Sequence, residues 1–165
     1  MLWLHLMKSK VKKKSIVFIL LVCVAVLWGS IPAIAGPAPA LTKVDIQAFT
    51  AQNYNYQWKT TPAGYPKSMS DYSFSGPELY MTVIYAGIPN WDLTFLKVNG
   101  TQYKHSQLLD QQFFITDSGR MVAGYKIIYK IPPTYLAAVN TVTVTSRGTN
   151  GGTRDGLSTN IKFVK

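Results

Sequence analysis

The sequence is poor in the residues that carry most metal and redox chemistry. Among 165 residues, Cys23 is the only cysteine, and His5 and His105 are the only histidines. A zinc centre needs three or four converging cysteine, histidine or carboxylate ligands. A single cysteine also excludes a disulfide within the chain. We therefore expect neither a metal site nor a cofactor.

Acidic residues are scarce as well, with seven in total, of which only Glu78 is a glutamate. A pair of catalytic carboxylates would have to combine Glu78 with an aspartate from a polar loop. The chain also lacks the Gly-x-Ser-x-Gly pattern of a nucleophile elbow, so we interpret His105 as a solvated strand end beside a turn. The sequence predicts a protein that is not an enzyme. A small hydrolase using His105 or Glu78 is the alternative.

The first forty residues follow the pattern of an export signal. A lysine cluster at 8–14 precedes the apolar run 16–28, and the small residues Ala33 and Ala35 follow it. This order is typical of a cleaved secretory signal peptide, and the run is shorter than the about 20 residues of a membrane-spanning helix. We predict a signal peptide at 1–35 and a Pro/Ala-rich lead-in at 36–42. The lysine cluster favours bacterial export to the cell surface or the medium. An uncleaved anchor, or a lipid on Cys23, is the alternative.

Cleavage would leave a moderately basic protein. Five of the 17 lysines and arginines lie in the leader. The other 12 and the seven acidic residues give the cleaved chain a net charge of +5. Such a surface attracts anionic polymers, for example wall teichoic acids or acidic glycans, although solubility alone is a sufficient explanation. For an exported chain we expect neither nucleic acid as a partner nor stable insertion into a membrane.

Alternating side chains dominate residues 43–165, which we take as one domain. The segment 44–49 alternates with Val44, Ile46 and Ala48 on one face, and 54–58 alternates with Tyr54, Tyr56 and Trp58 on one face. This period of two indicates strands. Residues 79–85 form an apolar run typical of a central strand, and the longest alternating segment, 121–131, ends at Pro132.

Turn signals separate these segments. Asn99-Gly100 is the strongest hairpin signal, because both central residues of a type I′ turn have positive φ. The only helical signal is about one turn near residues 134–138. The sequence therefore predicts an all-β fold, an antiparallel β-sandwich of seven to nine strands.

The C-terminal third resembles a known fold family. The segments 129–135, 140–146 and 158–163, with a glycine-rich loop at 148–156, are similar to the last three strands of fibronectin type III and other immunoglobulin-like domains. The resemblance implies an immunoglobulin-like topology for the sandwich. The chain departs from it by lacking the Cys-Trp-Cys core and by the inserted Leu136-Ala137-Ala138. A fold of this kind says little about function.

Aromatic residues make up 13% of the chain, and several fall in polar segments. Exposed rings stack on sugars or peptides, and arginines hold anionic groups. The candidate ligand-binding residues are Tyr54, Tyr56, Trp58, Trp91, Arg147 and Arg154. The alternative is that Tyr54, Tyr56 and Trp58 form the buried face of a strand.

The sequence therefore favours a secreted, non-enzymatic binding or surface-interaction protein that recognises carbohydrate or an anionic cell-envelope polymer. The alternative is a secreted protein-binding effector, such as a toxin, an inhibitor or a matrix component. It would act through protein contacts or through self-association along an edge strand.

Overall fold

A computed structural model describes residues 37–63, 67–155 and 159–165. The predicted signal peptide at 1–35 lies outside the described residues. The elements are β1 (Lys43–Ala51), η1 (Gln52–Tyr54), β2 (Lys59–Thr60), β3 (Lys67–Ser75), β4 (Leu79–Ala86), β5 (Pro89–Val98), β6 (Thr101–Lys104), α2 (His105–Leu108), β7 (Leu109–Thr116), β8 (Val122–Ile131), η2 (Pro133–Tyr135), β9 (Val139–Gly148), β10 (Thr153–Asp155) and β11 (Thr159–Val164).

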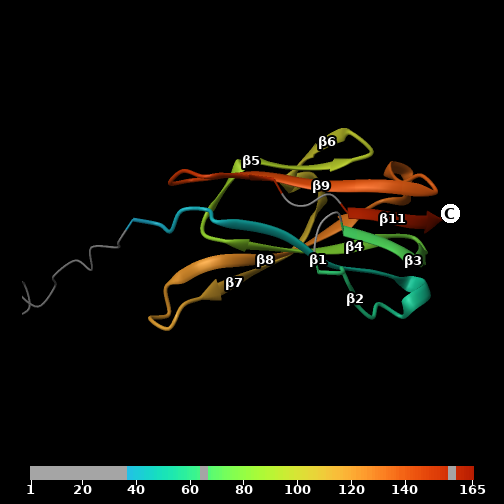
Figure 1. The fold of residues 1–165 in the computed structure, drawn as a ribbon, viewed down its shortest axis with the longest axis horizontal. Coiled ribbons are helices and arrows are strands. Elements are labelled where there is room, and N and C mark those ends of the chain that lie inside the picture. Colours follow the sequence, from blue (N-terminus) through green and yellow to red (C-terminus); the bar gives the residue numbers. More distant parts are fainter. Residues whose placement is uncertain (1–36, 64–66, 156–158) are drawn as a thin grey trace, which may run out of the picture. The chain divides into compact units, whose positions relative to one another are not determined.

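The strands form two sheets that stack on each other (Figure 1). One sheet has the order β2-β1-β4-β8-β7, and the other has the order β3-β11-β9-β5-β6 with β10 paired to β9. Figure 1 shows β5, β6 and β9 in one layer and β1, β7 and β8 in the other. The predicted all-β sandwich is confirmed. No helix in the described ranges is long and apolar enough to span a membrane.

Two details differ from the expected antiparallel sandwich of seven to nine strands. The described residues contain eleven strands. The predicted number is lower because the two-residue β2 and the three-residue β10 are too short to show an alternating pattern in the sequence. In addition, β3 pairs with β11 in parallel, whereas every other pair is antiparallel. The two-sheet arrangement is compatible with an immunoglobulin-like fold.

The core lies between the sheets and is built from alternate residues of the long strands. Its largest fully buried side chains are Phe49, Phe74, Tyr85, Tyr129 and Phe163. The alternation of 44–49 sets Phe49 on the face opposite Val44, Ile46 and Ala48, but in the structure all four side chains are buried. The pairing of β1 with β4 shifts between Ile46 and Ala48, and such a bulge reverses which face the following residues occupy.

Other local predictions hold. Asn99 and Gly100 connect β5 to β6 with φ values of 52° and 84°, as a type I′ turn requires. The apolar strand β4 lies centrally between β1 and β8. In β8, Ile127, Tyr129 and Ile131 are buried as predicted. Met121, which was expected on the same face, precedes the strand and is 53% exposed.

Candidate functional site

The segment 54–58 is a folded turn, so the strand predicted there is wrong. After β1 the chain makes one turn of 3-10 helix, and Asn55 and Tyr56 then take positive φ values of 51° and 58°. The amide of Gln57 donates to the carbonyl of Tyr54 at 2.9 Å. This reversal returns the chain to pair β2 with β1. A short polar side chain such as Asn55 tolerates the left-handed conformation, and this is the local signal for the turn.

Of the three aromatic residues of the turn, Tyr54 packs against the domain, whereas Tyr56 and Trp58 are exposed. Tyr54 is half-buried and packs edge-on against Phe74 and Tyr72, at ring-centroid distances of 5.4 and 6.0 Å. Tyr56 is 48% exposed and Trp58 is 41% exposed. The alternative of a wholly buried strand face therefore does not apply to Tyr56 or Trp58.

Contacts with the sheet fix the turn in place. The Thr50 hydroxyl donates to the carbonyl of Gln57 at 2.9 Å. The ring of Tyr56 meets Tyr80 of β4 edge-on at 5.9 Å. The Lys59 ammonium lies 4.8 Å from the ring centroid of Tyr54, within the range of a cation–π contact. The Tyr56 ring therefore packs on an ordered support, and the turn has a cation beside it.

A charged group adjoins this support. The Tyr80 hydroxyl donates a short hydrogen bond to Glu78, and Lys130 lies 3.2 Å from the same carboxylate. The hydrogen bond to Glu78 raises the pKa of Tyr80 to about 12. The hydrogen bond from Tyr80, followed by Lys130, lowers the pKa of Glu78. At neutral pH Tyr80 is therefore protonated and donates to Glu78, which is ionised.

Trp91 lies elsewhere, in a cluster between the sheets. Its ring stacks on His105 at 4.3 Å and meets Tyr125 and Tyr85 edge-on at 5.1 and 5.5 Å. Tyr80 and Tyr85 are five residues apart on one strand, and they therefore point to opposite faces of the sheet. The structure does not bring Trp91 together with Tyr56.

His105 is buried, and its prediction as a solvated strand end is wrong. It is 5% exposed, and its Nδ1 lies 2.9 Å from the Tyr129 hydroxyl, which is 2.6 Å from that of Tyr85. Burial lowers the pKa of His105 to about 4, so the ring is neutral at pH 7. His105 and Leu108 share the buried face of α2, and this i, i+3 spacing is the signal that sequence reasoning missed.

This buried cluster joins the two sheets through hydrogen bonds that link Tyr85, Tyr129 and His105. Among the described residues, no carboxylate or serine hydroxyl is hydrogen-bonded to His105. Burial raises the pKa of both Tyr85 and Tyr129, which keeps them protonated. The cluster therefore satisfies the hydrogen bonding of two buried hydroxyls and an imidazole.

The two predicted arginines lie apart from both the turn at 54–58 and the buried cluster around Trp91. Arg147 on β9 pairs with Thr153 of β10, and both Arg147 and Arg154 are exposed. The Arg154 side chain donates to the carbonyl of Thr42 at 2.9 Å, and Thr42 itself bonds Ala86 at the far end of β4 from Tyr80. Six residues of extended strand span about 20 Å, so the arginines do not share a site with Tyr56 and Trp58.

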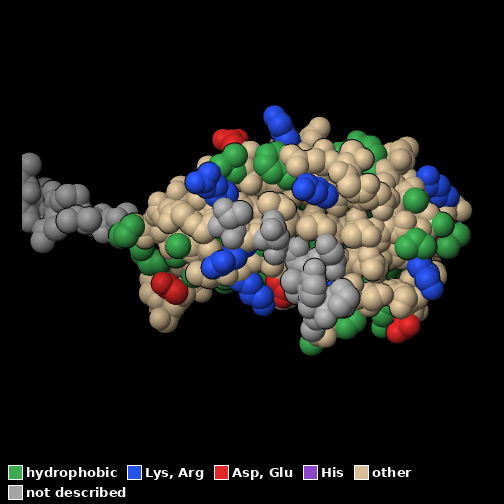
Figure 2. All heavy atoms as spheres, turned by 45° about the horizontal axis from the view of Figure 1, so that its top comes forward, with side chains coloured by type: hydrophobic (Ala, Val, Ile, Leu, Met, Phe, Trp, Pro, Cys, Tyr) green, Lys and Arg blue, Asp and Glu red, His purple; other side chains and the backbone are tan. Residues whose placement is uncertain are grey.

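The sheet that carries Arg147 has an outer face rich in cations. Lys97 of β5, Lys104 of β6, Arg147 of β9 and Lys162 of β11 are exposed. The strands β6, β9 and β11 contain no acidic residue, and the ion pairs among the described residues use none of these four cations. Figure 2 shows lysine and arginine side chains spread over the side that includes this layer, with fewer acidic ones between them. This face attracts anions over a distance.

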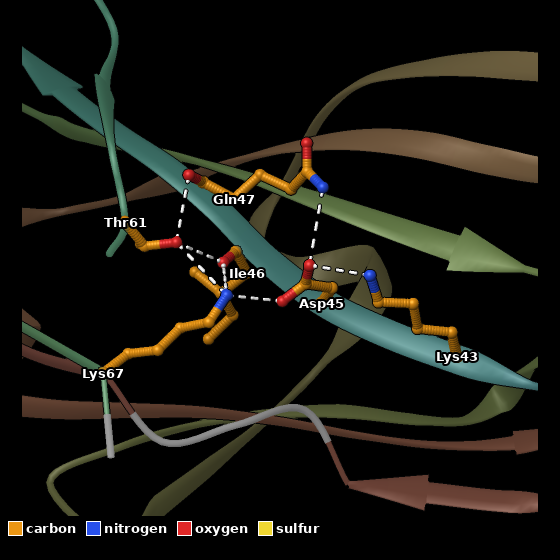
Figure 3. Close-up of polar contacts among 6 residues, drawn as sticks. All are labelled: Lys43, Asp45, Ile46, Gln47, Thr61 and Lys67. Atoms are coloured by element: carbon orange, nitrogen blue, oxygen red, sulfur yellow. Dashed lines mark hydrogen bonds and ion pairs between the residues drawn. The ribbon is translucent and has the colours of Figure 1, made fainter. Parts of the chain in front are cut away.

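A second charged group is buried, at Lys67 (Figure 3). Its ammonium donates to Asp45 at 2.5 Å, to the carbonyl of Ile46 at 2.8 Å and to the Thr61 hydroxyl at 3.2 Å. Burial alone would raise the pKa of Asp45, but Lys67 and Lys43 outweigh it and lower this pKa. All three hydrogens of the ammonium are used, so Lys67 anchors the start of β3 to β1 and is not a free nucleophile.

Among the described residues, no three histidine, cysteine, aspartate or glutamate side chains lie together as metal ligands would. The described residues form an all-β domain of two stacked sheets. The chain belongs to the family described as "Domain of unknown function (DUF4879)", whose family model matches residues 36–163. A comparison with curated proteins gave no match.

Proposed function

We propose that this chain is an exported, non-enzymatic binding module that recognises a carbohydrate-containing, anionic polymer of the cell envelope. The observation that carries the proposal is the exposure of Tyr56 and Trp58, 48% and 41%, on one ordered turn. Planar rings with a wet edge stack on sugar faces. Loops held on a rigid scaffold are frequent binding sites.

Charge complements the rings. Lys59 and Lys130 lie beside the turn, and the exposed cations of the β3-β11-β9-β5-β6 sheet add a field that draws a polyanion to the protein. Binding should therefore depend on salt concentration only in part. Screening weakens the long-range attraction, whereas contact between a ring and a sugar persists. Retention should therefore fall with salt but not vanish for a ligand that contains sugars.

The fold and the leader support the same proposal. We propose an immunoglobulin-like topology for the sandwich, supported by its two sheets and by the β9–β10 hairpin of the glycine-rich segment. We also propose secretion, supported by the lysine-rich and apolar pattern of residues 8–35. The family model begins at residue 36, directly after the proposed leader.

Retention on purified cell walls tests the proposal. The test uses the secreted product on intact walls, on walls stripped of teichoic acid and on neutral polysaccharides, at low and high salt. We expect the double variant Tyr56→Ala, Trp58→Ala to lose most retention. Tyr135→Ala is the matched control, because Tyr135 is 39% exposed and stacks on Tyr103 of β6, in the sheet that does not contain β1 and β2. Retention that the double variant leaves unchanged would refute the assignment of these rings.

A further inference from the structure

The strand orders of the two sheets end in four edge strands, and the three-residue β10, which pairs only with β9, has a free side as well. All of these except β7 are short or covered. β2 has two residues and β6 has four. β3 is long, but the Asn53 side chain donates to the carbonyl of Ser73 at 2.7 Å and accepts from the amide of Ser75 at 3.0 Å. Asn53 thereby occupies backbone groups that another strand would need. Such devices protect sheet edges from unwanted pairing.

β7 is the long edge without this protection. It has eight residues, and none of the side-chain hydrogen bonds among the described residues reaches its backbone. Its sequence, Leu-Asp-Gln-Gln-Phe-Phe-Ile-Thr, contains no lysine, proline or glycine. Phe113 is 46% exposed and Phe114 is 65% exposed. An exposed, apolar edge of this length is a template for another strand.

The regular part of β7 is centred on one residue. The pairing of β7 with β8 shifts at both ends, between Leu109 and Gln111 and between Ile115 and Thr116. The uninterrupted stretch is therefore 111–115, and its midpoint is Phe113. Two copies of this strand can pair along the whole regular stretch about a two-fold axis at its midpoint, because the axis exchanges residues equally spaced from that point.

We propose that β7 pairs in antiparallel orientation with β7 of a second copy of this chain, about a two-fold axis at Phe113. Phe113 then faces its counterpart, and Gln112 faces Phe114 of the other copy. Cross-strand aromatic pairs stabilise a sheet. The five-stranded sheet of one copy, which ends at β7, then continues into the same sheet of the second copy.

Charge and register favour this partner. Asp110 is the single charged residue of β7, and in this register the two copies of Asp110 lie at opposite ends of the paired strands. No like charges therefore face each other. An axis at Gln112 is less favourable, because it sets Asp110 opposite Phe114 and extends the pairing into the irregular end of the strand.

Single cysteines test the register. In the background Cys23→Ser, the substitutions Phe113→Cys and Gln111→Cys each introduce the only thiol of the chain. Directly opposed residues of antiparallel strands have Cα atoms about 4.5–5.5 Å apart, a separation that a disulfide spans. We expect Phe113→Cys to give a disulfide-linked dimer in the culture supernatant and Gln111→Cys to stay mainly monomeric, because it faces Ile115. Absence of the dimer, or equal dimer for both variants, would overturn the proposal.

Sedimentation velocity tests the interface without a crosslink. We expect reversible dimers of the secreted product at about 100 µM or below, and at least roughly tenfold weaker association for Phe113→Lys. Val139→Lys is the matched control, because it makes the same charge change at a 64% exposed position of β9 and should leave association unchanged. Circular dichroism confirms that both variants are folded. A product that is monomeric throughout, or a dimer that Phe113→Lys does not weaken, contradicts the proposal. The polymer-binding proposal survives either result, because β7 and β2 lie at opposite edges of one sheet.

Discussion

Replacement of Lys67 by methionine should destabilise the fold by about 2–3 kcal/mol. The substitution keeps the apolar stem and removes a buried ammonium that donates to Asp45, Ile46 and Thr61. Breaking a buried ion pair costs about 3–5 kcal/mol when the remaining charge has no other partner. Here Asp45 keeps Lys43 at 3.2 Å, and the Thr61 hydroxyl still donates to Ile46 at 2.8 Å. The cost should therefore fall below that range.

Urea unfolding followed by circular dichroism measures this loss as a lower midpoint with an unchanged slope. Lys43→Met is the matched control, because its side chain is 60% exposed and an exposed ion pair contributes only about 0–1 kcal/mol. The double variant Asp45→Asn, Lys67→Met should be more stable than the sum of the single changes predicts. A Lys67→Met protein within about 0.5 kcal/mol of the unmodified protein, or no more destabilised than Lys43→Met, would refute the reasoning.

The effect of Lys67→Met should also depend on pH. The pKa of Asp45 is lowered from 3.8 in the folded protein. A lowered carboxylate pKa contributes stability above its unfolded value and loses that contribution as the pH falls through the folded value. The difference between Lys67→Met and the unmodified protein should therefore shrink below about pH 3.8. A difference that stays constant down to pH 2 would contradict an ionic origin.

Two further predictions concern His105 in the buried cluster and Gly124, where β8 pairs with β4. The pKa of His105 is near 4 in the folded protein against 6.5 when exposed, so unfolding takes up a proton between these values and stability should fall by about 2–3 kcal/mol from pH 6.5 to pH 4. Unfolding midpoints measured over this range check it, and an equally steep loss in His105→Phe would refute the assignment to His105. Gly124→Ala should cost at least about 1–3 kcal/mol, because an added Cβ would lie 2.1 Å from the carbonyl oxygen of Tyr85. Thermal melting measures this cost, and a variant as stable as the unmodified protein would show that β8 shifts without penalty.

Sequence alone predicted the features that depend on neighbouring residues. The Asn99-Gly100 turn and the long strand β8 follow from local φ requirements and from a period of two. The alternation of Tyr54, Tyr56 and Trp58 has the same period but belongs to a folded turn, in which a 3-10 turn over 52–54 is followed by the left-handed residues Asn55 and Tyr56. A short alternating pattern does not distinguish the two cases.

Features that depend on distant partners were not predictable in this way. The position of Phe49 depends on a bulge opposite β4, and the burial of His105 depends on Trp91 and Tyr129. The same limit applies to the candidate site. The composition indicates exposed aromatics and excess cations, but only the register places Trp91 and the arginines away from Tyr56 and Trp58.

The most direct test of the account is the retention of the secreted product on purified cell walls with and without the rings of Tyr56 and Trp58. The account predicts retention of the unmodified protein and of Tyr135→Ala, and loss of most retention in the folded double variant Tyr56→Ala, Trp58→Ala. Equal retention of all three proteins, or no retention of the unmodified protein even at low salt, would contradict it.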